Sequence, residues 1–284
     1  MKLSVVIPAH NEDACIAYTV RELYDRLSAE QIEHEILVIN DNSSDQTESA
    51  LISLATELHT LRYLNNPPPH GFGFAVRRGL DNFSGDAVAV YMADASDRPE
   101  DLVSYFRTME EKQVDCVFGS RFIRGGKTVD YPRPKLILNR IANSFIQVVF
   151  GLRYNDTTNA FKLYRRHVID GLRPLLSHHF NLTVELPLKA IVRGYTYAVV
   201  PNYWINRKVG ASRLHIQEMG SRYLFIVLYC LIEKWLSKRD YHRKTFVQLT
   251  DKSGILNVAT RSNSETLKND DEHRDGVRVK HAAS

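Results

Sequence analysis

Two aspartates, Asp94 and Asp97, follow a short apolar run, Ala87 to Met92, and precede Pro99. The run is typical of a buried strand, and the proline suits the first turn of a helix. Open α/β sheets bind ligands at the C-terminal ends of such strands. Carboxylate oxygens there favour Mg²⁺ or Mn²⁺, whose other positions can take nucleotide phosphate oxygens. The alternative is a helix start whose acidic residues only complement the helix dipole.

Polar clusters also follow two earlier apolar runs. The first run leads into Ala9-His10-Asn11-Glu12, and the second into Asp41-Asn42-Ser43-Ser44-Asp45. In a parallel sheet these strand ends lie on one edge, so the three clusters are expected to lie together. Neither GxGxxG nor GxxxxGK[ST] accompanies them, which argues against a Rossmann dehydrogenase and a P-loop enzyme. A nucleotide site built from side chains and a metal is favoured.

The elements that must position these clusters alternate along the chain. Strands are predicted at 3–8, 35–41, 61–64, 87–92, 115–119, 156–164 and 197–201. Stripes of apolar residues at helical spacing lie between most of them, for example Ile16, Val20, Leu23 and Leu27. The alternation predicts an α/β fold with a mostly parallel central sheet and helices on both faces. The glycine-rich, cationic segment 120–133 is predicted to be a loop, and a helix is predicted to follow it and end near Gly151.

Composition limits the classes of protein that fit. The 284 residues are 44% hydrophobic, with a formal net charge of +4 and three widely spaced cysteines. Such a chain can build a large core, and its weak positive charge does not indicate a nucleic-acid partner. The cysteine spacing fits neither a zinc site nor a disulfide framework, so a reducing cytoplasm is expected. The N-terminus lacks the pattern of a signal peptide.

The C-terminal part divides in two. Residues 216–244 hold the apolar run Tyr223 to Ile232, then Trp235 and several cations. The run is shorter than the roughly 20 apolar residues that span a bilayer, so the segment could lie in a membrane interface. The alternative is an amphipathic helix packed on the domain or in a dimer. Residues 245–284 are polar without apolar periodicity and are expected to be disordered. Residues 1–215 then form the main domain.

Seven segments occur in a recognisable order over about residues 3 to 214: VVIPAHNE, INDNSSDQT, GFGFAVRRGL, YMADASDRPED, FGSRF, DTTNAFKLYRR and VPNYWINRKVGASRL. Together they resemble family 2 glycosyltransferases, and within them the dolichol-phosphate mannosyltransferase-like group. The resemblance implies a GT-A nucleotide-sugar-binding fold with Mg²⁺ or Mn²⁺ on the donor diphosphate. The acidic motif departs from the family's Asp-x-Asp-x-Gln: here it is Ala93-Asp94-Ala95-Ser96-Asp97, with two carboxylates in shifted positions.

The resemblance also implies roles for individual residues. Asp94 and Asp97 would hold the metal, and Asp41 would contact the nucleobase. The remaining nucleotide-sugar residues are Pro8, Ala9, Asn11, Glu12 and Asn42. Arg121, Lys135 and Asn139 would lie near the acceptor phosphate. Arg207 and Ser212 would lie near the donor diphosphate, and Ser212 would also contact the acceptor. Asp156 and Glu185 would bind the sugar or support the acceptor loop; the alternative is helix and turn capping.

These expectations describe an inverting glycosyltransferase that moves a mannose or glucose-type hexose from a GDP- or UDP-linked donor to a polyprenyl or dolichyl phosphate. It would be peripheral at the cytoplasmic face of a membrane, and its oligomeric state is left open. One rival is a transferase that acts on a sugar hydroxyl of a surface polysaccharide. It would need a carboxylate base, and the usual Glu-Asp pair is absent because Leu186 follows Glu185. Another is an inactive nucleotide-sugar sensor.

Overall fold

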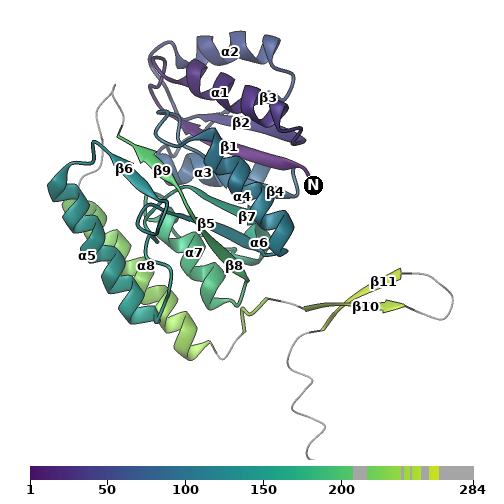
Figure 1. Cartoon of the computed structure of the whole chain (residues 1–284), viewed down its shortest axis with the longest axis vertical. Coiled ribbons are helices and arrows are strands. Elements are labelled where there is room, and N and C mark those ends of the chain that lie inside the picture. The colour runs from purple at the N-terminus through teal and green to yellow at the C-terminus, as the bar shows by residue number, and fades with distance from the viewer. Residues whose placement is uncertain (207–215, 238–239, 244, 251–255, 262–284) are drawn as a thin grey trace, which may run out of the picture. The chain divides into compact units, whose positions relative to one another are not determined.

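The computed structural model describes residues 1–206, 216–237, 240–243, 245–250 and 256–261 (Figure 1). The chain divides into two compact units, Met1–Tyr241 and His242–Ser284. The first unit carries the elements that position the candidate site.

A seven-stranded sheet forms the centre of the first unit, in the order β3-β2-β1-β4-β7-β5-β8. Six strands are parallel to one another, and β7 runs antiparallel to both of its neighbours. The prediction of a mostly parallel sheet is therefore confirmed. The strands are β1 (Leu3–Ala9), β2 (His34–Asn40), β3 (Leu61–Asn65), β4 (Ala87–Val90), β5 (Cys116–Ser120), β7 (Lys162–Arg165) and β8 (Tyr197–Pro201).

Helices cover both faces of this sheet, as predicted, because alternate strand residues point to opposite sides. Val5 and Ile7 of β1 belong to a core cluster with α1, α2 and α4, whereas Val6 belongs to a cluster with α3, α6 and α7. A Cβ added at Gly79 would lie 2.2 Å from a Val6 methyl carbon, so α3 packs closely on β1. The helices are α1 (Ile16–Ala29), α2 (Thr47–Glu57), α3 (Phe72–Asn82), α4 (Pro99–Lys112), α6 (Arg166–Gly171) and α7 (Leu182–Val192).

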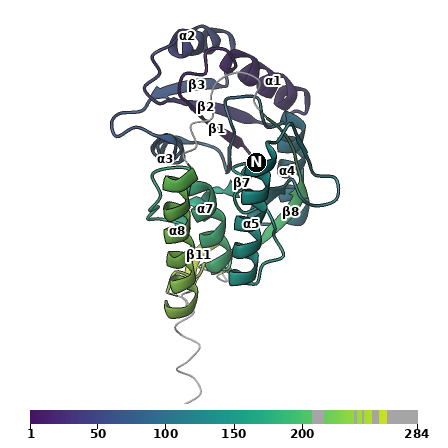
Figure 2. The same cartoon turned by 90° about the vertical axis from the view of Figure 1, so that its left-hand side faces the viewer.

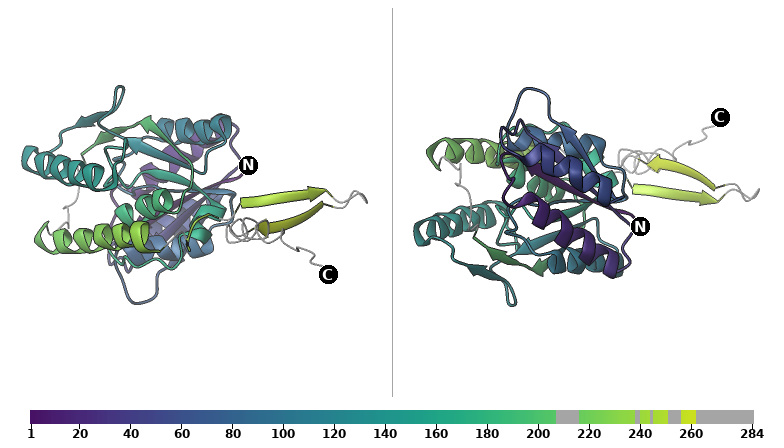
Figure 3. Two further views of the ribbon diagram at one scale, coloured as in Figure 1. Left: turned by 90° about the horizontal axis from the view of Figure 1, so that it is seen from below. Right: turned by 90° about the horizontal axis from the view of Figure 1, so that it is seen from above.

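Two longer helices, α5 (Arg133–Phe150) and α8 (Ile216–Leu236), lie side by side next to α7 (Figures 2 and 3). The three helices share a small core that includes Ile146, Leu188 and Ile226. The Lys234 ammonium also donates to the Phe150 carbonyl oxygen at 2.9 Å, which ties the C-terminal ends of α5 and α8 together. A short parallel pair is formed by β6 (Lys127–Val129), which lies between β5 and α5 in the sequence, and β9 (Tyr203–Ile205), which follows β8 (Figure 1). The predicted loop 120–133 thus contains a strand.

Charged residues fix α8 to the rest of the unit. The Arg193 guanidinium donates to both carboxylate oxygens of Glu233, at 2.7 and 2.9 Å, and both side chains are buried. Glu233 therefore anchors α8, although it interrupts the apolar sequence of that helix. The inner face of α8 packs on the domain, which was one of the two alternatives for this segment. Its outer face is exposed and apolar.

The second unit contains an antiparallel hairpin of β10 (Thr245–Thr250) and β11 (Leu256–Arg261), where the sequence predicts a disordered tail. The other residues of that tail lie outside the described part of the chain. Within the described residues, no helix combines the length and the apolar character needed to cross a membrane.

Candidate active site

The acidic loop after β4 places two carboxylates at the ligand edge of the sheet. Asp94 accepts a hydrogen bond from the Ser96 amide at 3.1 Å, and Ala95 between them has a φ of 54°. A left-handed alanine costs conformational energy and is typical of a functional loop. Strand β4 ends at Val90, so Tyr91 and Met92 already belong to this loop. The tyrosine hydroxyl donates to the Asp97 carbonyl oxygen at 2.6 Å and holds the loop down.

The surroundings of Asp97 would stabilise a bound positive charge. Its side chain is buried, and among the described residues its Oδ2 has no hydrogen-bond partner. Burial, reinforced by the negative charge of Asp94 and opposed by Arg121, raises the pKa of Asp97 to about 8. A divalent cation would supply the missing partner, so the two aspartates fit the implied metal. Among the described residues, no group of three or more His, Cys, Asp or Glu side chains is arranged to hold a metal ion.

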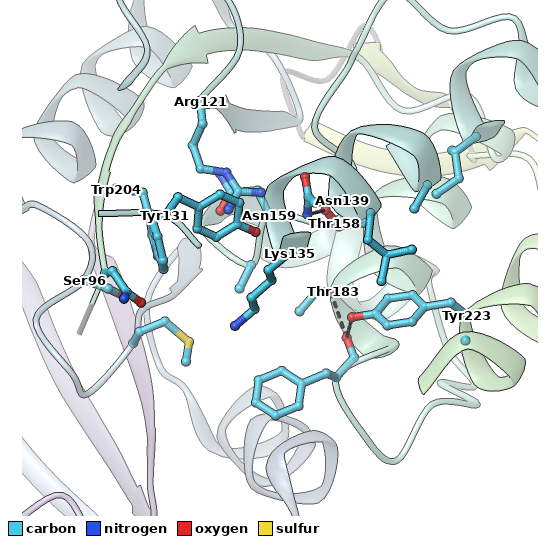
Figure 4. A pocket seen from close by; sticks show the side chains of 18 of the residues that line it. Ser96, Arg121, Tyr131, Lys135, Asn139, Thr158, Asn159, Thr183, Trp204 and Tyr223 are labelled. Atoms are coloured by element: carbon cyan, nitrogen blue, oxygen red, sulfur yellow. Dashed lines mark hydrogen bonds between the residues drawn. The ribbon is translucent and has the colours of Figure 1, made fainter. Parts of the chain in front are cut away.

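A pocket of about 460 Å³ opens beside this loop. Its polar lining includes Asp94, Asp97, Arg121, Lys135 and Asn139, and Figure 4 shows the last three around the pocket. One end lies between α5 and α8 and is lined by apolar side chains, which include Leu138, Phe145, Ile146, Leu224 and Val227. The structure therefore brings together five of the residues that were predicted to act, and joins them to an apolar channel.

Arg121 is held rigidly by Asp156. Its Nε and Nη2 donate to the two carboxylate oxygens at 2.8 and 2.6 Å, and its amide donates to Asp156 Oδ2 at 2.9 Å. Burial alone would lower the pKa of Arg121, but the Asp156 carboxylate outweighs it and raises that pKa. Tyr131 and Trp204, which form an edge-to-face pair with centroids 4.8 Å apart, lie next to the guanidinium. Asp156 is thus the support of Arg121 and does not line the pocket itself.

Lys135 and Asn139 come from the first turns of α5, which begins before the predicted stripe. Figure 4 shows the Lys135 side chain extending into the pocket. Asn139 and Asn143 both donate to the Thr158 hydroxyl, at 2.8 and 2.9 Å. These bonds join α5 to the loop before β7, which forms the opposite wall.

The predicted nucleotide residues after β1 and β2 form a second, interlocked group. Ala9 accepts from the Asp41 amide at 2.7 Å, and Asn11 Oδ1 accepts from the Ser44 amide at 2.8 Å. The Asp41 carboxylate is buried and accepts from Asn66 at 2.8 Å and from the Gly71 amide at 2.7 Å. Pro8, Glu12 and Asn42 belong to the same edge. In the described chain this group adjoins the pocket's strand edge without lining the pocket.

Other predicted residues have different positions. Glu185 is fully buried in α7, where it accepts from the Leu176 and Ser177 amides and from Lys189. Arg207 and Ser212 lie outside the described residues. Several residues that line the pocket were not predicted as site residues: Tyr131, Thr158, Phe180, Thr183, Trp204 and Tyr223. Thr158 and Trp204 belong to two of the motifs quoted above, and this membership could have identified them as candidate site residues.

Three comparisons with known proteins agree with this geometry. The model of the family described as glycosyl transferase family 2 matches residues 4–173. Polyprenol monophosphomannose synthase of Mycolicibacterium smegmatis is 28% identical over 216 residues, which cover 74% of this chain and 80% of that protein. Undecaprenyl-phosphate mannosyltransferase of Micrococcus luteus is 26% identical over 242 residues, which cover 83% and 96%.

Among solved structures, a similar one is glucosyl-3-phosphoglycerate synthase of Mycobacterium tuberculosis in complex with Mn²⁺, UDP and glucosyl-3-phosphoglycerate. The TM-score is 0.60 at 18% identity, and the match covers 92% of this chain and 87% of that one. This likeness shows the fold. The chain therefore has a GT-A fold and belongs to glycosyl transferase family 2, and its curated relatives support the dolichol-phosphate mannosyltransferase-like group.

Proposed function

We propose that this protein transfers a hexose, with mannose the first candidate, from a GDP- or UDP-linked donor to a polyprenyl phosphate, with inversion at the anomeric carbon. The observation that carries the proposal is the change of character along one pocket. Carboxylates and cations line one end, and apolar side chains of α5 and α8 line the other. A lipid phosphate has the same division between a charged head and an apolar tail. The names of the two curated relatives support mannose and a polyprenyl acceptor.

The polar end suits an acceptor that is its own nucleophile. A phosphate monoester with a second pKa of about 6 is largely ionised at neutral pH, so no side chain has to remove its proton. Arg121 and Lys135 line the pocket where such a phosphate would lie. The enzyme then acts by orientation and charge stabilisation.

The rival with a hydroxyl acceptor needs a carboxylate base near the acceptor. Among the described residues that line the pocket, the carboxylates are Asp94 and Asp97. Glu185 is engaged by Lys189 and two backbone amides, and Asp156 is engaged by Arg121. Neither buried carboxylate is available as a base, which favours the phosphate acceptor.

Metal dependence is part of the proposal. Asp94 and Asp97 would hold Mg²⁺ or Mn²⁺, and the bound ion would neutralise charge on the departing nucleoside diphosphate. The solved neighbour crystallised with Mn²⁺ and UDP supports a divalent ion in this fold.

We further propose that the protein docks on the cytoplasmic face of a membrane through α5 and α8. Both helices expose large apolar side chains around the pocket's apolar end, where the lipid would enter: Ile137, Leu138, Ile141, Phe145 and Val148 on α5, and Leu224, Phe225, Leu228, Ile232, Trp235 and Leu236 on α8. Many large apolar side chains exposed on two neighbouring helices are typical of a membrane or protein contact.

Vesicle flotation tests the docking. Ile232→Asp should reduce binding, because Ile232 is 56% exposed on α8 and a charge there opposes insertion. The matched control is Ile52→Asp on α2, where the isoleucine is 52% exposed but lies on another helix. Equal binding by both variants and the unchanged protein would remove α8 from the membrane contact.

A matrix of donors and acceptors tests the reaction. Purified protein is given GDP-mannose, GDP-glucose, UDP-glucose or UDP-N-acetylglucosamine with Mg²⁺ or Mn²⁺, and release of GDP or UDP is followed. The acceptors are undecaprenyl phosphate, undecaprenol without the phosphate, and 3-phosphoglycerate. We expect turnover with the lipid phosphate alone. Turnover with undecaprenol would favour the rival that uses a hydroxyl acceptor. An absence of turnover with every donor and acceptor pair would favour the inactive nucleotide-sugar sensor.

A further inference from the structure

Lys162 is a fully buried lysine beneath the pocket wall. Its side chain is 1% exposed, and its ammonium donates to three backbone carbonyl oxygens. The partners are Thr157 at 3.0 Å, Thr183 at 3.1 Å, and Asn159 at a short distance. An ammonium has three N–H donors and no acceptor, so its donors match these oxygens one to one.

The carbonyls belong to two different walls of the pocket. Thr157 and Asn159 lie in the loop before β7, whose residues Thr158, Asn159 and Ala160 line the pocket. Thr183 lies in the first turn of α7 and lines the pocket from another side. One buried charge therefore joins the loop to the helix.

The sequence of α7 explains why Thr183 needs this donor. In an α-helix the carbonyl of residue 183 accepts from the amide of residue 187, but position 187 is a proline inside the helix. Proline has no amide hydrogen, so the Thr183 carbonyl would be left unpaired at a buried position. The Lys162 ammonium takes the place of that amide.

We propose that Lys162 is a positioning residue for the acceptor: it holds the 157–160 loop and the first turn of α7 in a fixed relation, and so sets the width of the pocket beside Arg121. Burial lowers the pKa of Lys162 to about 7, with Asp156 opposing the shift and Arg121 adding to it. The three carbonyl oxygens favour the charged form. Assays at about pH 6.5 therefore keep the ammonium populated.

The test separates positioning from stability. Lys162→Met removes the ammonium but keeps an unbranched chain, and we expect the KM for undecaprenyl phosphate to rise at least tenfold while the donor KM stays within twofold. Adding Pro187→Ala restores an amide donor for the Thr183 carbonyl. The double variant Lys162→Met with Pro187→Ala should regain thermal stability but keep the high acceptor KM, because the loop is still not joined to the helix.

Lys189→Met is the matched control. Lys189 is also fully buried on α7, but its ammonium binds Glu185 and the Pro174 carbonyl oxygen, away from the pocket lining. This variant should lose stability without a selective rise in acceptor KM. The proposal is overturned if Lys189→Met shows the same rise, if donor and acceptor KM change together, or if the double variant recovers its acceptor KM with its stability.

The choice of acceptor rests on the proposed function, so one measurement uses no substrate. Amide exchange of Thr158, Asn159 and Phe161 should quicken in the double variant relative to Pro187→Ala alone, while Leu176 and Ser177, which bind Glu185, should not change. If the unchanged protein does not use a polyprenyl phosphate, the proposed function fails, and the exchange result still decides the role of Lys162. Unchanged exchange in the loop refutes that role.

Discussion

Gly220 gives a direct way to ask whether a lipid tail lies between α5 and α8. It lines the apolar end of the pocket, and among the described residues a Cβ added there would have no neighbour within 4 Å beyond the adjoining residues and backbone of its own helix. Gly220→Phe therefore adds an aromatic ring to the lining of the channel without a clash at its base. Glycine inside a helix is less favourable than most residues by up to about 1 kcal/mol, so the change should not weaken the fold.

The magnitude follows from the apolar surface that the ring would displace. At about 0.8 kcal/mol per buried CH₂, a five-carbon isoprene unit gains at most about 4 kcal/mol from the channel, which is roughly 10³-fold in affinity. Gly220→Phe should raise the KM for undecaprenyl phosphate by a factor between about 10 and 10³. The KM for citronellyl phosphate, which carries the same head on a much shorter tail, should change less than twofold.

The assay follows nucleotide release in detergent with both acceptors, and Leu228→Phe is the control. Leu228 is exposed on the same helix and does not line the pocket, so a ring there adds apolar surface without filling the channel. An unchanged KM for the long acceptor in Gly220→Phe would refute the placement of the tail between the helices. An equal rise with both acceptors would mean that the ring disturbs the polar end instead.

Two further predictions concern carboxylates at or beside the pocket. Asp94→Asn and Asp97→Asn should each lower metal-dependent turnover by roughly 10²-fold or more, because each removes a charged ligand from the site. The circular dichroism spectrum should stay unchanged. Near-normal rates at the same Mg²⁺ or Mn²⁺ requirement would exclude the two aspartates as ligands. Asp156→Asn should lower the free energy of unfolding in urea by about 3–5 kcal/mol, since it leaves the Arg121 charge buried and unpaired. Glu57→Gln breaks an exposed pair with Arg21 and should cost under about 1 kcal/mol, so equal losses would contradict the argument.

The sequence predicts the polar clusters at the strand ends well, because each cluster directly follows its strand in the chain. An apolar run followed by polar residues identifies β1, β2 and β4 and the clusters at their ends, and parallel pairing then puts the clusters on one edge. Asp94 and Asp97 were found in this way, and both line the pocket; Arg121, Lys135 and Asn139, which line it too, were found by resemblance.

The remaining walls of the pocket could not be derived in the same way, because their residues meet through tertiary packing. Hydrophobic periodicity does not encode the order of strands, so the insertion of β7 between β4 and β5 was not foreseen. Lys162 looks like a cation on the exposed face of a strand, and only the pairing of β7 on both sides shows that it is buried. Glu233 likewise interrupts an apolar run in the sequence, and its partner Arg193 is 40 positions away.

The place of β7 in the sheet affects how the chain can fold during synthesis. β5 pairs only with β7 and β8 among the described strands, and both leave the ribosome after it. Until residue 165 has emerged, the four N-terminal strands can assemble while the open side of β4 and both sides of β5 lack partners. Unpaired apolar strand edges promote association with other chains. A nascent chain stalled between residues 120 and 160 should therefore expose unpaired strand edges, and truncations for expression should end beyond β8.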